Sequence, residues 1–400
     1  MMMKGNKLKE LKINLGAENK IGINKKYHCT GCGVCTNICP QNCIQMEADK
    51  EGFLYPYIDK NKCLDCGLCR KICPESYDDQ SDIERVYGMY CKNSKVRNRS
   101  SSGGIFPVLA ERTIRNGGIV FGVKMNREKA VHCWIDSIED LPLLQGSKYV
   151  QSNPEDAYKK ARDFLEEGIE VLFTGTPCQI AALYSFLNKR YENLITMDFI
   201  CHGVSSPKVL ELYLKEIIGE DSLKEIQFRN KSNGWKEFSI YIKSSNNIYL
   251  KSMKEDPYLQ SFLQNLNIRP SCFFCRFRKV HRISDFTMGD LWENEKIVPE
   301  WNDDKGYSVV LVHNRKAEKI LETIKEAFCY KDINLNKVIE YNSSLLNSPW
   351  DLYSRDLFFK YIKKYSLTKA CLLSKKDGIR KKVGRKWKKL YYIIGERIKG

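Results

Sequence analysis

Two runs of cysteine near the N-terminus have the spacing of metal ligands. The first run is CTGCGVCTNICP and the second is CLDCGLCRKICP, and both have the form C-x2-C-x2-C-x3-C-P. This form is typical of 4Fe-4S clusters, where the fourth cysteine of each run binds the cluster of the other run. A pair of zinc sites is the alternative, but zinc ligands usually come as two CxxC pairs separated by a longer loop. The spacing therefore predicts two clusters that pass single electrons.

Each close-spaced trio of cysteines is expected to wrap one cluster, because Gly31, Gly33 and Gly67 let the backbone curl tightly. The remote cysteine of the other run completes each ligand set. We therefore assign the first cluster to Cys29, Cys32, Cys35 and Cys73, and the second to Cys63, Cys66, Cys69 and Cys39. Cys43 is expected to be a buried apolar neighbour of a cluster.

The remaining cysteines contain a second set of candidate ligands, because the chain has 17 cysteines and the two runs use only eight of them. Cys178 follows the strand-like segment EVLFTG, and Cys201 ends the strand-like segment LITMDFI. In an open α/β sheet, functional groups gather at the carboxyl ends of neighbouring strands. Cys272 and Cys275 add a CxxC pair. These four thiols predict a third 4Fe-4S cluster, with unrelated buried thiols, a redox dithiol in SCFFC or a zinc site as alternatives.

A serine- and glycine-rich segment, RNRSSSGGIF, precedes an amphipathic helix. A helix N-terminus with glycines is suited to binding phosphate, and Arg97 and Arg99 would strengthen an anion site, although a serine-capped helix is the alternative. The candidates for phosphate contact in this segment are Ser101, Ser102, Gly103 and Gly104. The TGT turn that ends at Thr176, and Lys148 in GSKY, are further candidates, although Lys148 alone would more often be a surface lysine. Such groups would suit a flavin dinucleotide, which links single electrons to hydride exchange.

The segments between these motifs predict the elements that position them. We expect strands at 45–59, 117–123, 131–136, 170–175 and 194–203, and helices at 154–168, 177–189 and 207–219, with Asn153 capping the first of these helices. This alternation predicts an α/β sheet with a parallel portion. A strand-rich stretch at 226–252 follows, and then a strand at 306–314 and a helix at 317–328.

Composition limits the class of protein. Hydrophobic residues make up 42% of the 400 residues, which is enough for two or three domains with cores, and no run approaches the ~18 apolar residues of a membrane span. A cysteine content of this kind predicts metal ligation in a reducing, cytoplasmic compartment. The net charge of +17 is concentrated in residues 375–400, where only Asp377 and Glu396 oppose the lysines and arginines. The mildly basic remainder argues against a specific nucleic-acid-binding domain.

Eight motifs in order resemble the beta subunit of the coenzyme F420 hydrogenase/dehydrogenase family, over residues from about 84 to 345. They are RSSSGGIF, GIVFGV, GSKYVQS, LFTGTPCQIAAL, ICHGVSSP, FRNKSNGW, RPSCFFCRF and SDFTMGDLW. The resemblance implies a non-Rossmann α+β flavoprotein that binds FAD beside a 4Fe-4S cluster, with Cys178, Cys201, Cys272 and Cys275 as the cluster ligands. It places Ser101, Ser102, Gly103, Gly104, Lys148 and Thr176 near FAD. Some members of the family are associated with cell-surface polysaccharide synthesis.

These observations predict an α+β chain with four parts. They are a lead at 1–22, a bacterial-type two-cluster ferredoxin domain at 23–80, a mixed α/β flavoprotein-like domain at 84–345 (parts 84–160 and 161–345), and a basic helical tail at 346–400. The tail residues Trp387, Tyr391, Tyr392, Ile393 and Ile394 would contact an anionic membrane surface at the inner membrane face, and a solvated helix or a partner-docking segment are the alternatives.

The predicted function is that of an iron–sulfur flavin oxidoreductase. Electrons would pass between the ferredoxin clusters, the third cluster and FAD, and hydride would be exchanged with a small organic substrate or a deazaflavin-like coenzyme. A redox partner protein or ferredoxin would exchange electrons with the chain. The alternative is a non-catalytic relay subunit that serves a partner enzyme. His132, His202 and Asp290 lie in the matching motifs, but we assign no acid or base, because a lone histidine or aspartate is more often structural.

Overall fold

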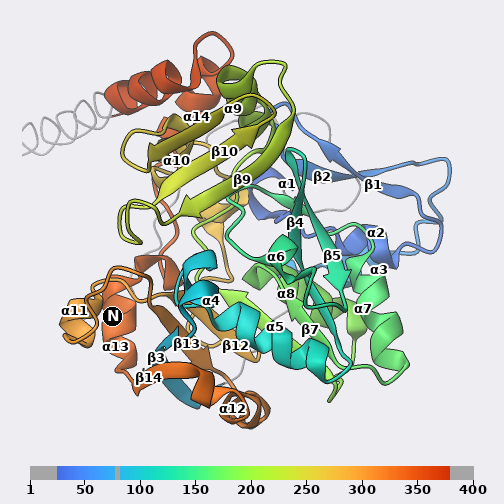
Figure 1. Ribbon diagram of the computed structural model, residues 1–400. Coiled ribbons are helices and arrows are strands. Elements are labelled where there is room, and N and C mark those ends of the chain that lie inside the picture. The colour runs from blue at the N-terminus through green and yellow to red at the C-terminus, as the bar shows by residue number, and fades with distance from the viewer. Residues whose placement is uncertain (1–24, 77–81, 379–400) are drawn as a thin grey trace, which may run out of the picture.

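The computed structural model describes residues 25–76 and 82–378 (Figure 1). A small cysteine-rich domain at the N-terminus lies against a larger domain built on a nine-stranded mixed sheet, and helices follow toward the C-terminus. The expected mixed α/β class with a ferredoxin-like N-terminal region is confirmed at this level. The lead at 1–22 and the tail aromatics expected at a membrane surface lie outside the described residues. No helix in the described ranges has both the length and the apolar character needed to cross a membrane.

The N-terminal domain is a pair of similar loops joined by a hairpin. Its elements are α1 (Lys25–His28), α2 (Val34–Ile38), β1 (Ile44–Ala48), β2 (Leu54–Ile58), α3 (Leu68–Lys71) and a 3-10 turn (Pro74–Ser76). The strand expected at 45–59 is therefore two antiparallel strands. The turn forms because the Asp49 carboxylate accepts hydrogen bonds from the backbone N–H groups of Glu51 and Phe53, both at 2.9 Å.

The larger domain contains the nine-stranded sheet, in the order β14-β3-β13-β12-β8-β7-β4-β5-β6. Its strands are β3 (Arg85–Cys91), β4 (Ile119–Asn126), β5 (Lys129–Ile135), β6 (Ser152–Asn153), β7 (Val171–Thr174), β8 (Leu194–Phe199), β12 (Phe286–Asp290), β13 (Ser308–Val312) and β14 (Phe328–Asp332). The central strands β4, β7, β8 and β12 run parallel, which confirms the predicted parallel portion. Their carboxyl ends therefore meet at one edge of the sheet.

Helices and a second sheet complete the larger domain. The helices are α4 (Ser94–Arg99), α5 (Ile105–Arg115), α6 (Leu141–Leu144), α7 (Ala157–Glu166), α8 (Pro177–Leu187), α9 (Pro207–Ile218), α10 (Pro257–Leu263), α11 (Asn294–Ile297), α12 (Arg315–Glu322), α13 (Leu335–Tyr341) and α14 (Leu352–Tyr361), with 3-10 turns at Pro270–Phe274, Lys325–Ala327 and Ser343–Leu345. The second sheet is antiparallel, in the order β11 (Ile248–Ser252), β10 (Ser239–Ser244) and β9 (Leu223–Asn230). It shares a hydrophobic core with α9, α10 and α14.

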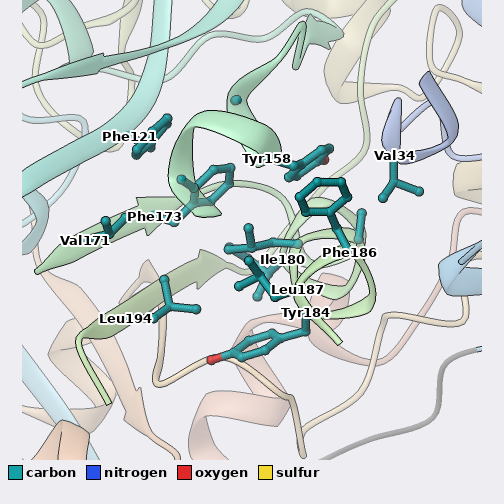
Figure 2. Packing of buried hydrophobic residues seen from close by; sticks show 14 of the residues in the cluster. Val34, Phe121, Tyr158, Val171, Phe173, Ile180, Tyr184, Phe186, Leu187 and Leu194 are labelled. Carbon is teal, nitrogen blue, oxygen red and sulfur yellow. The ribbon is translucent and has the colours of Figure 1, made fainter. Parts of the chain in front are cut away.

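One hydrophobic core joins the two domains. Val34 from α2 packs in the same buried cluster as Ile180 and Phe186 from α8 (Figure 2). Two hydrogen bonds also join the domains: the Tyr158 hydroxyl donates to the Cys32 carbonyl at 2.8 Å, and the Ser185 hydroxyl donates to the Ile72 carbonyl at 2.6 Å. The cysteine loops are therefore fixed against α7 and α8 (Figure 1).

Two predicted helix boundaries are wrong because strand pairing overrides local propensity. The helix expected at 154–168 begins at Ala157, since Asn153 belongs to β6, which pairs with Val131 of β5. The helix expected at 317–328 ends at Glu322, and Phe328 begins β14, opposite Cys91 in β3. Helix α14 falls within the predicted tail at 346–400, and it packs on the N-terminal domain through Phe359 and Phe53, whose ring centres are 6.0 Å apart.

Candidate iron–sulfur and cofactor site

The two cysteine runs fold into loops of the same form. Gly33 and Gly67 have φ angles of 71° and 73°, and each begins the short helix that contains the third cysteine of its run. Gly31 also has a positive φ of 71°. These left-handed positions favour glycine, since a side chain would be strained there. The glycines therefore allow tight turns between the cysteines of each run, as the sequence predicted.

The thiol neighbours of Cys32 and of Cys69 belong to the sets expected from the spacing. Burial raises the pKa of Cys32, and the neighbouring thiols of Cys35, Cys29 and Cys73 raise it further, so the last cysteine of the second run lies with the first trio. Cys69 has Cys63 and Cys66 as thiol neighbours. This grouping supports the cross-ligation of two adjacent clusters.

Cys43 lies beside the second set of thiols. It is buried, and its Sγ atom is 3.4 Å from that of Cys39. Burial, followed by the thiols of Cys39 and Cys63, raises the pKa of Cys43 to about 12. Cys43 is therefore buried beside cysteines assigned to the second cluster, in agreement with the expected position next to a cluster.

The four cysteines proposed for a third cluster come together from three distant segments. Cys178 lies in the first turn of α8, directly after the end of β7, and Cys201 follows the neighbouring strand β8. Cys272 lies in the 3-10 turn Pro270–Phe274, and Cys275 ends that turn. All four line one small cavity. Convergence at the carboxyl ends of β7 and β8 was expected from the sequence, and the structure shows it.

The first turn of α8 fixes Cys178 at the edge of the sheet where the carboxyl ends of the parallel strands meet. Thr176 is the N-cap, and a capping box joins it to Gln179: the Thr176 backbone N–H donates to Gln179 Oε1 at 3.0 Å. Pro177 occupies the first position of the helix, which suits its fixed φ. The Oγ1 atom of Thr176 lies 3.1 Å from Cys178 Sγ. A local motif therefore sets the thiol in place.

The electrostatics of this cavity fit a cationic inorganic core. Burial raises the pKa of Cys178, and Cys275 and Cys201 raise it further; burial and Cys272 raise the pKa of Cys201 to about 12. Four thiolates here need positive charge close by, which the irons of a cluster would supply. Among the described residues, no three His, Cys, Asp or Glu side chains lie close enough to hold one metal ion between them. Each thiolate of a cubane binds its own iron, so that group needs a wider spacing than a single ion.

Two arginines in the wall of this cavity form hydrogen bonds with the segment that contains Cys201. Arg278 donates to the His202 carbonyl at 2.6 Å, and Arg282 donates to Asp198 Oδ1 at 3.1 Å and to the Phe199 carbonyl at 3.0 Å. Both side chains line the cavity of the four cysteines. They therefore fix the segment around Cys201 and bring positive charge near the thiols.

A larger cavity of about 480 Å³ adjoins the cysteine cavity. Its volume lies in the range of ligand and cofactor sites. The two cavities share five lining residues, which are Ser152, Thr176, Gln179, Gly203 and Val204. A cofactor in the larger cavity would therefore lie directly beside the four cysteines. Of the six residues expected near FAD, this cavity is lined by Ser101, Ser102, Gly104, Lys148 and Thr176.

The serine–glycine turn is built into the wall of the larger cavity. Ser101 Oγ accepts hydrogen bonds from the backbone N–H and the hydroxyl of Ser147, at 2.7 and 2.9 Å. Gly104 has a φ of 91° and is the N-cap of α5, so the free N–H groups of this helix begin at the cavity. Gly103 is not among the lining residues; a Cβ atom there would lie 2.5 Å from the Met89 carbonyl oxygen, so this glycine allows close packing on β3.

Two cations expected at a phosphate are engaged elsewhere. Arg97 is buried and forms a two-point ion pair with Asp303 at 2.7 and 2.8 Å, so its role in an anion site is not supported. Lys148 donates from Nζ to three carbonyls at the end of α6, those of Leu143, Leu144 and Gln145, at 3.3, 3.0 and 2.7 Å. Burial lowers the pKa of Lys148 to about 7. Lys148 lines the cavity, but its ammonium group is directed to backbone oxygens.

The histidines and the aspartate of the matching motifs have different surroundings. His132 is buried against Phe173 and lines neither of the two cavities. His202 lines the larger cavity, and burial lowers its pKa to about 4, so the ring is neutral at pH 7. Asp290 also lines that cavity and accepts hydrogen bonds from Arg229 at 2.5 Å and from the Trp235 indole at 3.1 Å.

The fold and the site together define an iron–sulfur protein in which a two-cluster domain is docked on an α/β domain with a cofactor-sized cavity. Residues 169–336 match the family model for the C terminus of the beta subunit of coenzyme F420 hydrogenase/dehydrogenase, and residues 28–77 match the model for a 4Fe-4S dicluster domain. The chain therefore carries the C-terminal domain of this beta-subunit family together with an N-terminal dicluster domain, which confirms the resemblance. These two domains indicate an iron–sulfur electron-transfer protein with a redox role.

Among solved structures, the chain is similar to one in the xenon-derivatised F420-reducing [NiFe] hydrogenase complex from Methanosarcina barkeri. The identity is 15% and the TM-score is 0.46, over 67% of this chain and 90% of that chain. No curated protein matches the chain.

Several residues of the site were not identified from the sequence. Arg269 adjoins the CxxC pair and contacts the first cysteine run, as described below, while Arg278 and Arg282 line the cysteine cavity. All three are charged residues close to cysteines in the segment 269–282, which is the signal that could have found them. Gln179 and Ser147 gave no such signal, because their roles depend on capping and on a contact between distant loops.

Proposed function

We propose that the protein is an iron–sulfur flavin oxidoreductase, with a third 4Fe-4S cluster held by Cys178, Cys201, Cys272 and Cys275 and with FAD in the larger cavity. One observation carries this proposal: four cysteines that are distant in sequence line a small cavity that shares its wall with the 480 Å³ cavity. When bound, FAD would supply the exchange between single electrons and a hydride. The organic hydride partner would be a small molecule or a deazaflavin-like coenzyme.

The order of the cysteine sets supports a continuous electron path. Cys35 and Cys73 of the first set both have Cys69 of the second set as a thiol neighbour. Cys178 has Cys32 of the first set as a neighbour in turn. The first cluster would therefore stand between the second cluster and the third.

Tyr158 lies at the junction of the first and third cysteine sets. Burial raises the pKa of its hydroxyl, and the nearby thiols of Cys32 and Cys178 raise it further. The hydroxyl donates to the Cys32 carbonyl and holds that loop against the larger domain. Its role in this proposal is to fix the separation between the two cluster sites.

The serine–glycine turn and the shared wall suit the two ends of a dinucleotide. The N-terminus of α5, after Gly104, would bind phosphate through backbone N–H groups. Thr176 and Gln179, in the wall shared with the cysteine cavity, would face the flavin ring. His202, neutral at pH 7, would line the ring pocket without supplying a charge.

A redox partner would dock at the second cluster. In the loop of that cluster, Cys66 is exposed, and Leu64 and Leu68 are 67% and 41% exposed. Lysines and arginines outnumber acids in the surrounding segment 59–71. An acidic electron carrier of the ferredoxin type would complement this apolar and basic surface.

Iron and flavin analysis of the anaerobically purified chain tests the proposal. The expected content is about twelve irons, four for each cubane, and one FAD per chain. Cys178→Ala should lower the iron content to about eight and alter the flavin spectrum, whereas Cys371→Ala, at a buried thiol that lines neither cavity, should change neither. About eight irons in both the unmodified chain and the Cys178→Ala variant would remove the third cluster. Purified chain without flavin would favour the relay subunit.

A further inference from the structure

Arg269 is a fully buried arginine that links the two domains. It belongs to the larger domain, where its backbone N–H donates to the Val204 carbonyl at 2.9 Å and its carbonyl accepts from the Cys272 N–H at 3.0 Å. Its side chain extends to the first cysteine loop of the N-terminal domain. One residue therefore contacts the backbone of a proposed third-cluster ligand and the loop of the first cluster.

The guanidinium group is held in one orientation against Cys29. Nε donates to the Cys29 carbonyl at 2.8 Å, Nη2 donates to Cys29 Sγ at 3.7 Å, and Nη1 donates to Gln151 Oε1 at 3.2 Å. The Tyr55 ring covers the group, with its centroid 4.0 Å from Cζ. Hydrogen bonds and packing thus place a permanent positive charge beside a ligand of the first cluster.

The cysteine loop has a shape that admits this side chain. Gly31, between Cys29 and Cys32, has a φ of 71°. A Cβ atom at Gly31 would lie 2.9 Å from Arg269 Nη1 and 2.3 Å from Gln151 Nε2. The loop can therefore approach the guanidinium closely only because position 31 lacks a side chain.

Arg269 differs from the other buried arginines because it has no carboxylate partner among the described residues. In the described ranges, the other buried arginines form ion pairs, Arg97 with Asp303, Arg229 with Asp290, Arg282 with Asp198, and Arg355 with Glu51. No carboxylate of the described residues pairs with Arg269. A buried charge is unfavourable unless an opposite charge compensates it. The available negative charge is that of the Cys29 thiolate and the cluster that it binds.

We propose that Arg269 raises the reduction potential of the first 4Fe-4S cluster. A cluster with four thiolates has a net negative charge, which increases by one when the cluster accepts one electron. A fixed positive charge and a hydrogen bond to a ligand sulfur both stabilise that reduced state. The larger domain thereby makes the cluster docked against it the better electron acceptor. The inference rests on the dicluster domain and does not require FAD or the third cluster.

An EPR-monitored redox titration of the full chain tests the role of Arg269. Arg269→Gln removes the charge at similar size, and Arg269→Lys keeps the charge. Arg355→Gln is the matched control, because it removes another buried cation at the same domain interface that contacts no cluster ligand. The Cys35→Ser variant identifies the signal of the first cluster by altering one of its ligands.

At a fixed potential near the midpoint, Arg269→Gln should lower the ratio of reduced to oxidised first cluster at least tenfold, which is about 59 mV for one electron. Arg269→Lys should lower it less than threefold, and Arg355→Gln should leave it unchanged. An unchanged ratio in Arg269→Gln with intact iron content would overturn the inference, as would an equal shift in Arg355→Gln. If Arg269→Gln and Arg269→Met both fail to assemble the first cluster, the role is structural and the inference is also overturned. Flavin content, measured on the same samples, reports separately on the proposed function.

Discussion

The internal repeat of the N-terminal domain provides a matched pair of substitutions, Gly33→Ala and Gly67→Ala. The two glycines occupy the same place in the two loops, with φ angles of 71° and 73°. Only their surroundings differ. A Cβ atom at Gly33 would lie 2.5 Å from Cγ of Pro154 in the larger domain, whereas a Cβ atom at Gly67 would meet nothing within 4 Å.

The expected effects follow from this difference. Both substitutions place alanine in the left-handed region, at a cost of about 1–2 kcal/mol. Gly33→Ala additionally forces a side chain into packed atoms of the interface, which costs typically about 1–3 kcal/mol more. That extra term corresponds to roughly 5- to 150-fold in the equilibrium between docked and undocked domains.

Loss of the visible iron–sulfur absorbance across a urea series measures this difference. Gly67→Ala should lower the midpoint slightly, and Gly33→Ala should lower it clearly further, at the same initial iron content. Electron transfer from the first cluster to the larger domain should slow in Gly33→Ala alone. Equal midpoints in the two variants would refute the tight contact between α2 and the segment around Pro154.

Two further predictions concern pH and partner docking. Burial lowers the pKa of Lys231 to about 7, and its Nζ donates to the Ser102 carbonyl at 2.8 Å. Because the pKa of a lysine in an unfolded chain is about 10.4, the unfolded chain binds more protons than the folded chain between these two pKa values, so stability should rise with pH across this window. Lys231→Met should flatten that rise in thermal unfolding measured from pH 7 to 10; an unchanged slope would contradict the assignment. Leu64→Asp should slow reduction by an acidic ferredoxin but not by dithionite, whereas Leu250→Asp, at a 44% exposed position on β11, should affect neither. Equal rates in both variants would count against docking at the second cluster.

The sequence predicted those parts of the site that depend on local spacing or on strand order. The prediction of two N-terminal clusters follows from fixed cysteine spacings within each run, and the dicluster model that matches residues 28–77 supports it. The meeting of Cys178 and Cys201 follows from consecutive strands β7 and β8, which pair in parallel. Both kinds of signal are readable because they need no knowledge of distant contacts.

The parts that sequence reasoning missed depend on distant partners. Arg97 looked suited to an anion, but its charge is compensated by Asp303, 206 positions along the chain. Lys148 was expected at a phosphate, but the carbonyls at the end of α6 compete for its ammonium group. Phe328 begins a strand because β3 offers an unpaired edge, although its segment has helical propensity. Contacts with partners that are distant along the chain leave no pattern in the local sequence from which they could be predicted.

The contact between Arg355 and Glu51 ties the C-terminal helix α14 to the N-terminal domain. Arg355 is fully buried, pairs with Glu51 at 2.5 Å and donates to the Ile268 carbonyl at 2.7 Å. The matched family segment covers residues 169–336, so both residues of this latch lie outside it. Replacement of the N-terminal domain by a dicluster domain from another protein would therefore need an acidic residue at the position of Glu51. Without that residue, Arg355 would be buried without its counterion. Exchange of the dicluster domain is therefore constrained by residues in that domain and in helix α14.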